Sequence, residues 1–308
     1  MDLRQLRYFL SICEQGSLSR AATVLRVAQP ALSLHLKRLE AEFGCPLLHR
    51  TSRGVVPTEA GTRLAQRAQT LQTMMNDLID DVRGIEAAPA GPAVIGIPTS
   101  LGTILTVPLV KLIREHYPDI RLRVVESLSG HMQEWILSGE VDMAVVFGIE
   151  PPAGLTAEFL ARESLCLVAA KNSPDMRGRD RIDMESVLTL PLIMPSRPHG
   201  VREEVERAAT IRRRPPNVIV ELDALDQIKT LVADGIGYTI LSQRFARHGD
   251  IAARLDTIPI FRPAIERTIS LAHASGQPLS SAARAVHGQL RALVAGHTRN
   301  GYWSDDHG

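Results

Sequence analysis

The sequence predicts three consecutive parts: an all-α winged helix-turn-helix, a long linker helix, and an α/β domain made of two subdomains. Three observations predict this order. Residues 1 to about 57 carry short apolar stripes at helical spacing, residues 64–85 carry one long apolar seam, and residues from 93 onward alternate between strand-like and helical runs. Alternation of the last kind is typical of βαβ units with parallel sheets.

Length and composition agree with a globular protein of about two domains. The chain has 308 residues, and its 44% hydrophobic and 22% charged residues are ordinary values. The formal net charge of +1 gives no overall field that would indicate a nucleic-acid binder. The first sixty residues are nevertheless basic, with eight Lys or Arg against five Asp or Glu. The position of these charges therefore matters more than their number.

The three cysteines, Cys13, Cys45 and Cys166, lie far apart and form no CxxC or Cys/His motif. We expect reduced thiols, with neither a disulfide framework nor a metal site. The first residues, MDLRQLRYFLSI, lack the long apolar core of a secretory signal, and no apolar run approaches the ~20 residues that span a bilayer. We therefore expect a cytoplasmic protein that does not enter a membrane.

The first sixty residues contain three short amphipathic helices, and residues 18–37 predict a helix-turn-helix. Ser17 is placed to cap the second helix. The third helix, AQPALSLHLKRLEAEFG (28–44), has one apolar stripe and an opposite side of mixed chemistry. The apolar stripe consists of Leu32, Leu36, Leu39 and Phe43. The opposite side consists of Gln29, Pro30, Ser33, Leu34, Lys37 and Arg38.

The mixed side of the third helix has the chemistry that reads DNA. Gln29 has the amide that pairs with adenine, and Ser33 donates to or accepts from either base. Lys37 and Arg38 are placed one turn later for phosphates, and Leu34 is placed for a thymine methyl group. The alternative is a small helical domain whose polar side is only solvated.

The residues that follow, CPLLHRTSRGVVPTEAG (45–61), favour DNA binding. They predict a small β-hairpin whose tip carries Arg50, Thr51 and Arg53, suited to grip the DNA backbone beside the groove. The candidate DNA-binding residues are therefore Ser17, Gln29, Pro30, Ser33, Leu34, Lys37, Arg38, Arg50, Thr51 and Arg53.

One long helix is predicted from Thr58 to about Ala87. Thr58 caps its start, and Pro89, Gly91 and Pro92 end it in a hinge-like linker. Its apolar residues alternate at spacings of four and three, as in the a/d seam of a coiled coil. The seam consists of Leu64, Ala68, Leu71, Met75, Leu78, Val82 and Ile85. We expect it to pair two copies of the chain; the alternative is a helix that lies on its own domain.

No catalytic constellation is found in the α/β region. The nucleophile elbow, the P-loop, the HExxH helix and the dinucleotide fingerprint are absent, so we expect neither an enzyme nor a cofactor. Hydroxyl-rich turns instead follow predicted strands, in IPTSLGTI (97–104), SLSGH (127–131) and PSRPHG (195–200). Helix amino termini at strand ends bind anions, and three such turns favour a shared ligand cleft over separate helix caps.

Residues 3–61 resemble the winged helix-turn-helix of LysR-type transcriptional regulators. The most specific matching segments are GSLSRAA, AQPALS, RLE, LLHR and PTEAG. The pair Leu34-His35 departs from the polar pair common in that family. This departure bears on which operator sequence is bound, not on whether the domain binds DNA. AVIGIPTS, SGEVDMAVVFG and the last third are most similar to the nitrogen-assimilation and aromatic-catabolism regulators.

The resemblance implies a full domain plan. It places a DNA-binding domain at 1–58, a linker and dimerisation helix at 59–88, and a periplasmic-binding-protein-like effector domain at 91–300. The two subdomains of the effector domain then comprise residues 91–161 with 268–296, and residues 162–267. Residues 297–308 are polar and are expected to form a loose tail.

The resemblance also implies partners and a ligand site. The partners are double-stranded DNA, further copies of the chain in a dimer or tetramer, a small effector and RNA polymerase. The implied effector residues are Thr99, Ser100, Leu101, Ser129, Gly130, Phe147, Ser196, Arg197 and His199. Arg197 and His199 favour a carboxylate if they point inward. Two alternatives remain, a regulator that needs no ligand because its cleft is vestigial, and a solute-binding protein.

Overall fold

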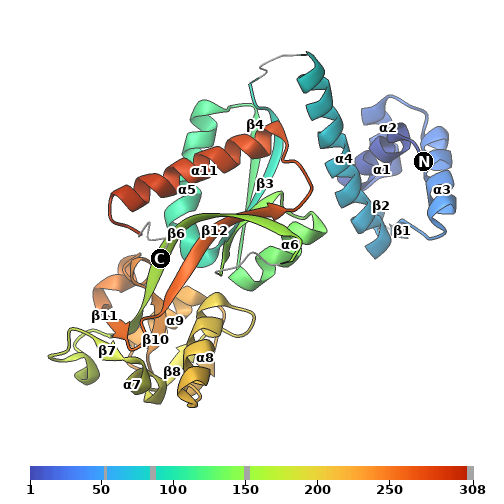
Figure 1. Ribbon diagram of the computed structural model, residues 1–308. Coiled ribbons are helices and arrows are strands. Elements are labelled where there is room, and N and C mark those ends of the chain that lie inside the picture. Colours follow the sequence, from blue (N-terminus) through green and yellow to red (C-terminus); the bar gives the residue numbers. More distant parts are fainter. Residues whose placement is uncertain (52–53, 84–87, 149–152, 304–308) are drawn as a thin grey trace. The chain divides into compact units, whose positions relative to one another are not determined.

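The computed structural model describes residues 1–51, 54–83, 88–148 and 153–303 (Figure 1). The chain divides into two compact units, one formed by Met1–Ala88 with the short segment Ser138–Glu140 and the other by Pro89–Leu137 with Val141–Gly308. Each unit has its own hydrophobic core, so each is described by itself. None of the helices in the described ranges is both long and apolar enough to cross a membrane.

The first unit packs three short helices against a hairpin and the start of a long helix. Leu32, Leu36 and Leu39 are buried in its core, which confirms most of the predicted apolar stripe of the third helix, and Phe9 and Ile12 of the first helix are buried beside them. Phe43 is an exception, with 44% of its surface exposed, because it is the last residue of its helix and lies beyond the core cluster. The elements are α1 (Leu3–Gln15), α2 (Leu18–Leu25), α3 (Gln29–Phe43), β1 (Leu48–Thr51), β2 (Gly54–Pro57) and α4 (Glu59–Arg83).

Both predicted helix caps of this unit are confirmed. The Ser17 Oγ accepts a hydrogen bond from the backbone N–H of Arg20 at 3.4 Å, which caps α2. The Thr58 Oγ1 accepts from the backbone N–H of Gly61 at 2.9 Å and donates to the Pro46 carbonyl at 2.8 Å. Thr58 therefore fixes the start of α4 to the chain that leads into the hairpin.

The antiparallel hairpin β1–β2 is anchored to the turn between α1 and α2. The backbone N–H of Val55 donates to the Gly16 carbonyl at 2.9 Å. A Cβ atom on Gly54 would lie 2.2 Å from that carbonyl oxygen, and the φ of Gly54 is +135°. Only glycine fits here, because the positive φ and the close approach both exclude a side chain. The hairpin is therefore held at a fixed place beside the helix-turn-helix.

An eight-stranded sheet runs through the described part of the second unit, in the order β4-β3-β5-β12-β6-β11-β7, with β10 also paired to β6. β8 and β9 form a separate two-stranded sheet. The strands are β3 (Gly91–Pro98), β4 (Ile120–Ser127), β5 (Met143–Phe147), β6 (Leu155–Ala170), β7 (Ile182–Asp183), β8 (Leu192–Met194), β9 (Val218–Glu221), β10 (Thr239–Ser242), β11 (Leu255–Phe261) and β12 (Glu266–Ala274). The helices are α5 (Thr99–His116), α6 (Met132–Ser138), α7 (Met184–Thr189), α8 (Gly200–Arg212), α9 (Leu225–Ala233), α10 (Gln243–Ala246) and α11 (Ser281–Arg299).

Two strands run through both subdomains of this unit. β6 pairs with β12 along its first part and with β10 and β11 along its last part. Separate core clusters lie on the two sides of this crossing: α5 and α11 contribute to one and α7 and α8 to the other. Figure 1 shows the long β6 and β12 ribbons leading from one subdomain to the other.

The prediction of parallel sheets is correct for only part of the second unit. β3 is parallel to β4 and β5, but β12 is antiparallel to both β5 and β6. β10 and β11 are also antiparallel to β6. The cause is the double crossing, because the strand that returns from the second subdomain runs against the strands beside it. The strand pattern also missed β11, LDTIPIF, whose Asp and Pro interrupt the apolar run.

The expected loose tail is wrong for the described residues 297–303. α11 continues to Arg299, and Thr298 and Trp303 are buried. The Trp303 indole N–H donates to the Glu163 Oε1 at 3.3 Å, and the ring belongs to the first core cluster. Most residues of this segment are polar, but the one buried aromatic residue, Trp303, packs it against the core. Residues 304–308 lie outside the described residues.

Candidate nucleic-acid interface and effector site

The outer face of α3 is exposed at both ends of the helix and at Leu34 in its middle. Gln29, Pro30, Lys37 and Arg38 are exposed, and Leu34 keeps 50% of its surface exposed. Ser33 is half-buried at the edge of this face. Ala28 precedes the helix as its N-cap and has no side-chain oxygen to accept from the first-turn N–H groups. Those N–H groups and the positive end of the helix dipole are therefore available to a phosphate.

His35 does not belong to this face. Its ring is half-buried and meets the Tyr8 ring edge to face, with centroids 5.2 Å apart. Of the unusual pair Leu34-His35, only Leu34 is therefore presented to a partner of α3. A large aliphatic side chain on an exposed face costs free energy in water, and contact with a thymine methyl group offsets that cost.

The hairpin adds two exposed polar residues to the candidate DNA interface. Arg50 and Thr51 are exposed on β1, and the Thr51 Oγ1 donates to the Gly54 carbonyl at 3.2 Å. Arg53 lies outside the described residues. Ser17 is half-buried and its hydroxyl caps α2, so its position at the start of the helix-turn-helix serves local structure.

The seam of α4 divides into two parts. Leu64 and Ala68 pack against Leu6 and Leu10 of α1, as the alternative interpretation of this helix expected. Beyond them the apolar residues are exposed, with Leu78 62% and Val82 79% exposed, and the described residues of their own unit do not cover them. The exposed apolar residues of α4 are Leu71, Met74, Met75, Leu78, Ile79 and Val82. Ile85 lies outside the described residues.

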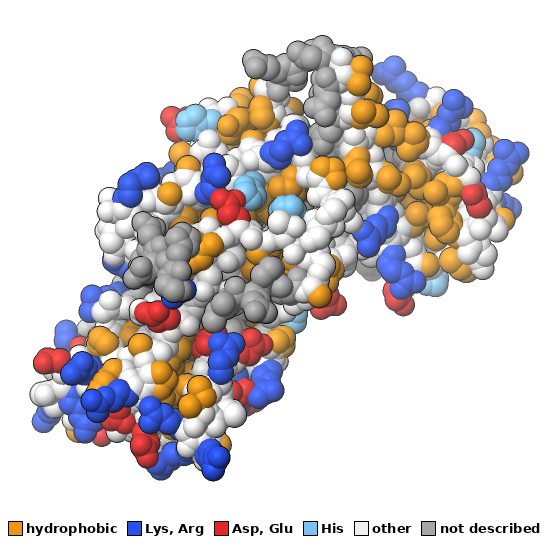
Figure 2. Space-filling view, viewed as in Figure 1, with side chains coloured by type: hydrophobic (Ala, Val, Ile, Leu, Met, Phe, Trp, Pro, Cys, Tyr) orange, Lys and Arg blue, Asp and Glu red, His pale blue; other side chains and the backbone are white. Residues whose placement is uncertain are grey.

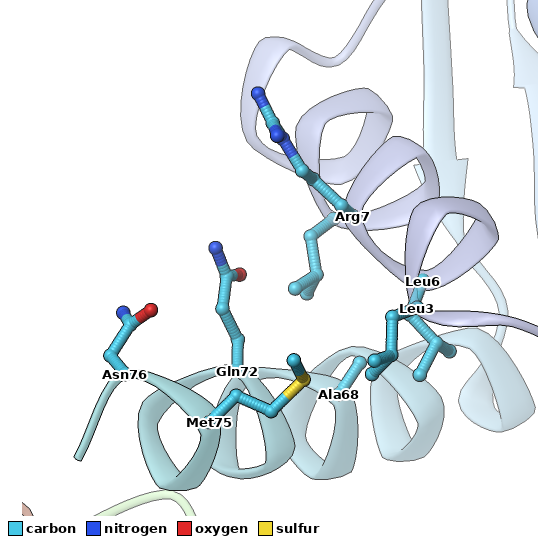
Figure 3. A pocket seen from close by; sticks show the side chains of 8 residues that line it. Leu3, Leu6, Arg7, Ala68, Gln72, Met75 and Asn76 are labelled. Atoms are coloured by element: carbon cyan, nitrogen blue, oxygen red, sulfur yellow. The ribbon is translucent and has the colours of Figure 1, made fainter. Parts of the chain in front are cut away.

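A groove of about 200 Å³ lies between α1 and the exposed part of α4. Figure 3 shows Leu3 and Leu6 of α1 beside Ala68, while the Arg7 guanidinium extends away from α4. Figure 2 shows hydrophobic side chains gathered on the surface of this unit in the region of α4. Leu3 is 50% exposed at the edge of the groove, so α1 extends the apolar face of α4.

In the second unit, the predicted effector residues form two groups. The first group lies at the amino terminus of α5. The Thr99 Oγ1 donates to the Ser127 carbonyl at 3.3 Å, and Ser100 is 4% exposed. The Leu101 side chain is fully buried in the core, so only its backbone is available to a ligand.

The second group is formed where the two subdomains meet. The backbone N–H of Gly200, at the start of α8, donates to the Ser129 Oγ at 3.0 Å. A Cβ atom on Gly130 would lie 2.3 Å from the Pro198 carbonyl oxygen, so a side chain there would push the subdomains apart. A Cβ atom on Gly200 would lie 3.3 Å from the Phe147 ring. Ser129, Gly130 and Phe147 thus lie against the loop that leads into α8.

The remaining predicted residues stabilise that loop. The Ser196 backbone N–H and hydroxyl both donate to the Asp223 Oδ1, at 2.9 and 2.6 Å. These two hydrogen bonds hold the pKa of Asp223 below its ordinary value. The Arg197 side chain is 71% exposed and pairs with Glu206. Arg197 therefore points away from the subdomain contact and does not supply an inward positive charge.

His199 points inward but is uncharged at neutral pH. Its side chain is 3% exposed, and its Nδ1 accepts from the backbone N–H of Val201 at 3.2 Å, which caps α8. Burial, with the nearby Arg267 charge as a second cause, lowers the pKa of His199 to about 4. The imidazole therefore acts as a neutral cap rather than as a cation for a ligand.

Sequence reasoning missed a buried ion pair beside these residues. Arg267 on β12 and Glu163 on β6 are opposite each other in the sheet, with 2% and 4% of their surfaces exposed. The Arg267 Nε and Nη2 both donate to the Glu163 Oε2, at 2.8 and 2.6 Å. Arg267 also contacts Ser100 and Phe147. The only signal in the sequence was a charge at the edge of each apolar run, RTISLAH and RESLCLVAA.

Of the three cysteine thiols, Cys166 is buried, and Cys13 and Cys45 are half-buried. Burial raises the pKa of Cys13 to about 11 and that of Cys166 to about 12. Because the thiolate is the reactive form, both thiols are inert at neutral pH.

Comparison with known proteins identifies both parts of the chain. Residues 3–62 match the family described as "Bacterial regulatory helix-turn-helix protein, lysR family", and residues 86–295 match "LysR substrate binding domain". The nitrogen assimilation regulatory protein nac of Klebsiella aerogenes is 33% identical over 296 residues, which are 96% of each chain.

Solved structures show the same fold. A full-length OxyR variant from Pseudomonas aeruginosa matches with a TM-score of 0.77 at 22% identity, covering 100% of this chain and 99% of that one. Full-length CbnR complexed with its target DNA matches with a TM-score of 0.62 at 18% identity, covering 96% and 99%.

Proposed function

The chain belongs to the LysR family of DNA-binding transcriptional regulators, and we propose that it binds a dyad-symmetric operator as a dimer or tetramer. We further propose that a small anionic effector binds between the two subdomains of the second unit and changes the relative placement of the dimers on DNA. RNA polymerase is the proposed partner through which the bound regulator acts.

The observation that carries the DNA-binding mode is the exposed outer face of α3. It combines an amide, a hydroxyl, two cations and one aliphatic side chain on a helix whose other face is buried. Each of these groups has a partner in the major groove or on its phosphates. The hairpin, fixed by Gly54, supplies Arg50 to the adjacent backbone.

The apolar face of α4 supports pairing with a second copy. Six large apolar residues on one helix are exposed within the described chain, and the groove beside α1 continues this surface. A second α4 covers such a face because it presents the same residues across a twofold axis. Two recognition helices related by that axis read two half-sites, about one helical turn apart or a multiple of it.

The effector proposal rests on the residues gathered between the subdomains. Ser129 and Phe147 lie against the start of α8, and Arg267 links Phe147 to Ser100 in the first turn of α5. Movement of one subdomain against the other changes the separation of these residues. A ligand shifts that equilibrium only if it binds one arrangement more tightly. The alternative is a regulator that needs no ligand. A solute-binding role is not favoured, because the helix-turn-helix occupies residues 3–62.

Selection of bound sequences from random double-stranded DNA by the full chain tests the binding mode. We expect an enriched sequence with two inverted half-sites. Enrichment of a single half-site without a dyad would contradict dimeric binding, and absence of any enriched sequence would contradict specific readout by α3.

A further inference from the structure

The Arg267 guanidinium is only partly used by the protein. A guanidinium has five N–H donors in a rigid plane, with one edge formed by Nε and Nη2 and an outer edge formed by Nη1 and Nη2. The first edge is occupied by the Glu163 carboxylate. On the outer edge, Nη2 donates to the Ser100 Oγ at 3.2 Å. The Nη1 atom is buried and has no hydrogen-bond partner among the described residues.

The outer edge faces the amino terminus of α5. Ser100 is the second residue of that helix, and Nη1 lies beside Nη2 on the edge of the guanidinium that meets it. Within the part of the chain that the structure describes, no side chain caps α5, whose N-cap is Pro98. One face of the guanidinium is covered by the Phe147 ring at 3.7 Å. A buried donor without a partner destabilises the folded protein, so this edge is incomplete in the structure.

We propose that Arg267 is the residue that receives the carboxylate of the effector, one oxygen on Nη1 and the other shared between Nη2 and the first turn of α5. This inference rests on the proposed effector function and deepens it. A carboxylate matches the two parallel donors of a guanidinium edge, and Ser100 gives way by turning its hydroxyl. The sequence analysis expected Arg197 and His199 to favour a carboxylate; in this proposal Arg267 of β12 supplies the hydrogen-bond donors instead.

Charge favours a monoanionic group over phosphate. Glu163 already balances Arg267, and His199 is uncharged at neutral pH. A second negative charge would find no further buried cation among the described residues around this edge. The Glu163 Oε1 accepts from the Trp303 indole, which fixes the carboxylate and through it the direction of the guanidinium. Trp303 is therefore a positioning residue for Arg267.

The test uses the full chain and three sodium carboxylates as probes, namely acetate, benzoate and succinate, with sodium chloride at equal ionic strength as the reference. Thermal unfolding and titration calorimetry are measured for the wild type and three variants. Arg267→Lys keeps the charge but loses the two-donor edge. Arg267→Met combined with Glu163→Gln avoids leaving a buried unpaired charge, in case the single variant does not fold. Arg197→Ala removes the exposed arginine and is the matched control.

We expect at least one carboxylate to raise the melting temperature of the wild type and of Arg197→Ala. Its Kd should rise on the order of 10-fold to 100-fold in both Arg267 variants, the range for losing a charge-assisted pair. Equal binding by wild type and the Arg267 variants would overturn the role of Arg267 while leaving the effector site standing. If no probe binds the wild type better than chloride does, both this inference and the carboxylate effector fail.

Discussion

At the scale of single residues, Leu34 separates this chain from a generic helix-turn-helix. Its neighbours on the outer face of α3 are polar or charged, and half of its own surface is exposed. His35, which follows it, is held against Tyr8 and contributes to packing instead. Operator preference at one base step should therefore depend on Leu34 more than on any other apolar residue of the helix.

We predict that Leu34→Arg changes the preferred base at one position in each half-site, because Arg pairs with guanine where Leu meets a thymine methyl group. The expected discrimination is about 1–3 kcal/mol, measured by selection from random DNA followed by anisotropy titrations. Phe43→Arg adds the same charge to the last turn of α3 and is the control. An unchanged base preference in Leu34→Arg would contradict this role.

His199 makes the stability of the second unit depend on pH. Burial lowers its folded pKa to about 4 from an ordinary 6.5, so the unfolded chain takes up the proton first as the pH falls. The contribution of His199 to the free energy of unfolding is complete above pH 6.5. On the order of 3 kcal/mol of this free energy is lost as the pH falls from 6.5 to about 4.

We predict that His199→Asn removes this part of the pH dependence, since Asn can cap α8 without titrating. The free energy of unfolding, measured by denaturant titration from about pH 7.5 to about pH 4.5, should fall less steeply in the variant than in the wild type. Parallel curves for the two proteins would show that His199 is not protonated in this range on unfolding.

Contacts between residues close in the sequence could be predicted, whereas contacts between distant residues could not. Contacts within one helix or turn, such as the caps by Ser17 and Thr58, follow from local spacing and were predicted. The Arg267–Glu163 pair joins residues 104 positions apart, and no local pattern links them. The direction of Arg197 was equally inaccessible, because it depends on how the loop into α8 brings this side chain to Glu206.

At the scale of elements, α4 serves two surfaces. Its first turns cover α1, and its later turns present apolar residues that nothing described in its own unit covers. The heptad spacing predicted one continuous seam because the sequence does not show where the contact with α1 ends. The structure divides the seam between Ala68 and Leu71.

We predict that Leu78→Lys weakens self-association, because each dimer would lose two buried leucines worth about 1.5–3 kcal/mol apiece and gain two facing charges. Sedimentation equilibrium should show a dimer dissociation constant raised by at least about tenfold. Ile211→Lys alters a residue that is 71% exposed on α8 and serves as the matched control. Equal association by both variants would argue against α4 as the pairing surface.

At the scale of the whole molecule, the sequence pattern predicts the class of each architecture, whereas the path of the chain decides how the strands pair. The helical pattern before residue 58 and the alternation after residue 93 were sufficient to predict the two architectures. They were not sufficient to predict antiparallel strands, because β6 and β12 cross between subdomains and pairing at a crossing is set by the path of the chain. Trp303 is buried for a similar reason: the chain after α11 brings its indole to Glu163 on β6.

The central claim is that the outer face of α3 meets DNA, and the salt dependence of binding by Lys37→Ala tests it most directly. Anisotropy titrations on the selected operator should be compared with Lys171→Ala, which removes an exposed lysine from the second unit. We predict that Lys37→Ala weakens binding, because one phosphate contact is lost from each protomer. The slope of the logarithm of the association constant against the logarithm of the salt concentration should become less negative by about one per protomer. Lys171→Ala should match the wild type. Equal affinities and slopes for Lys37→Ala and Lys171→Ala would contradict the account.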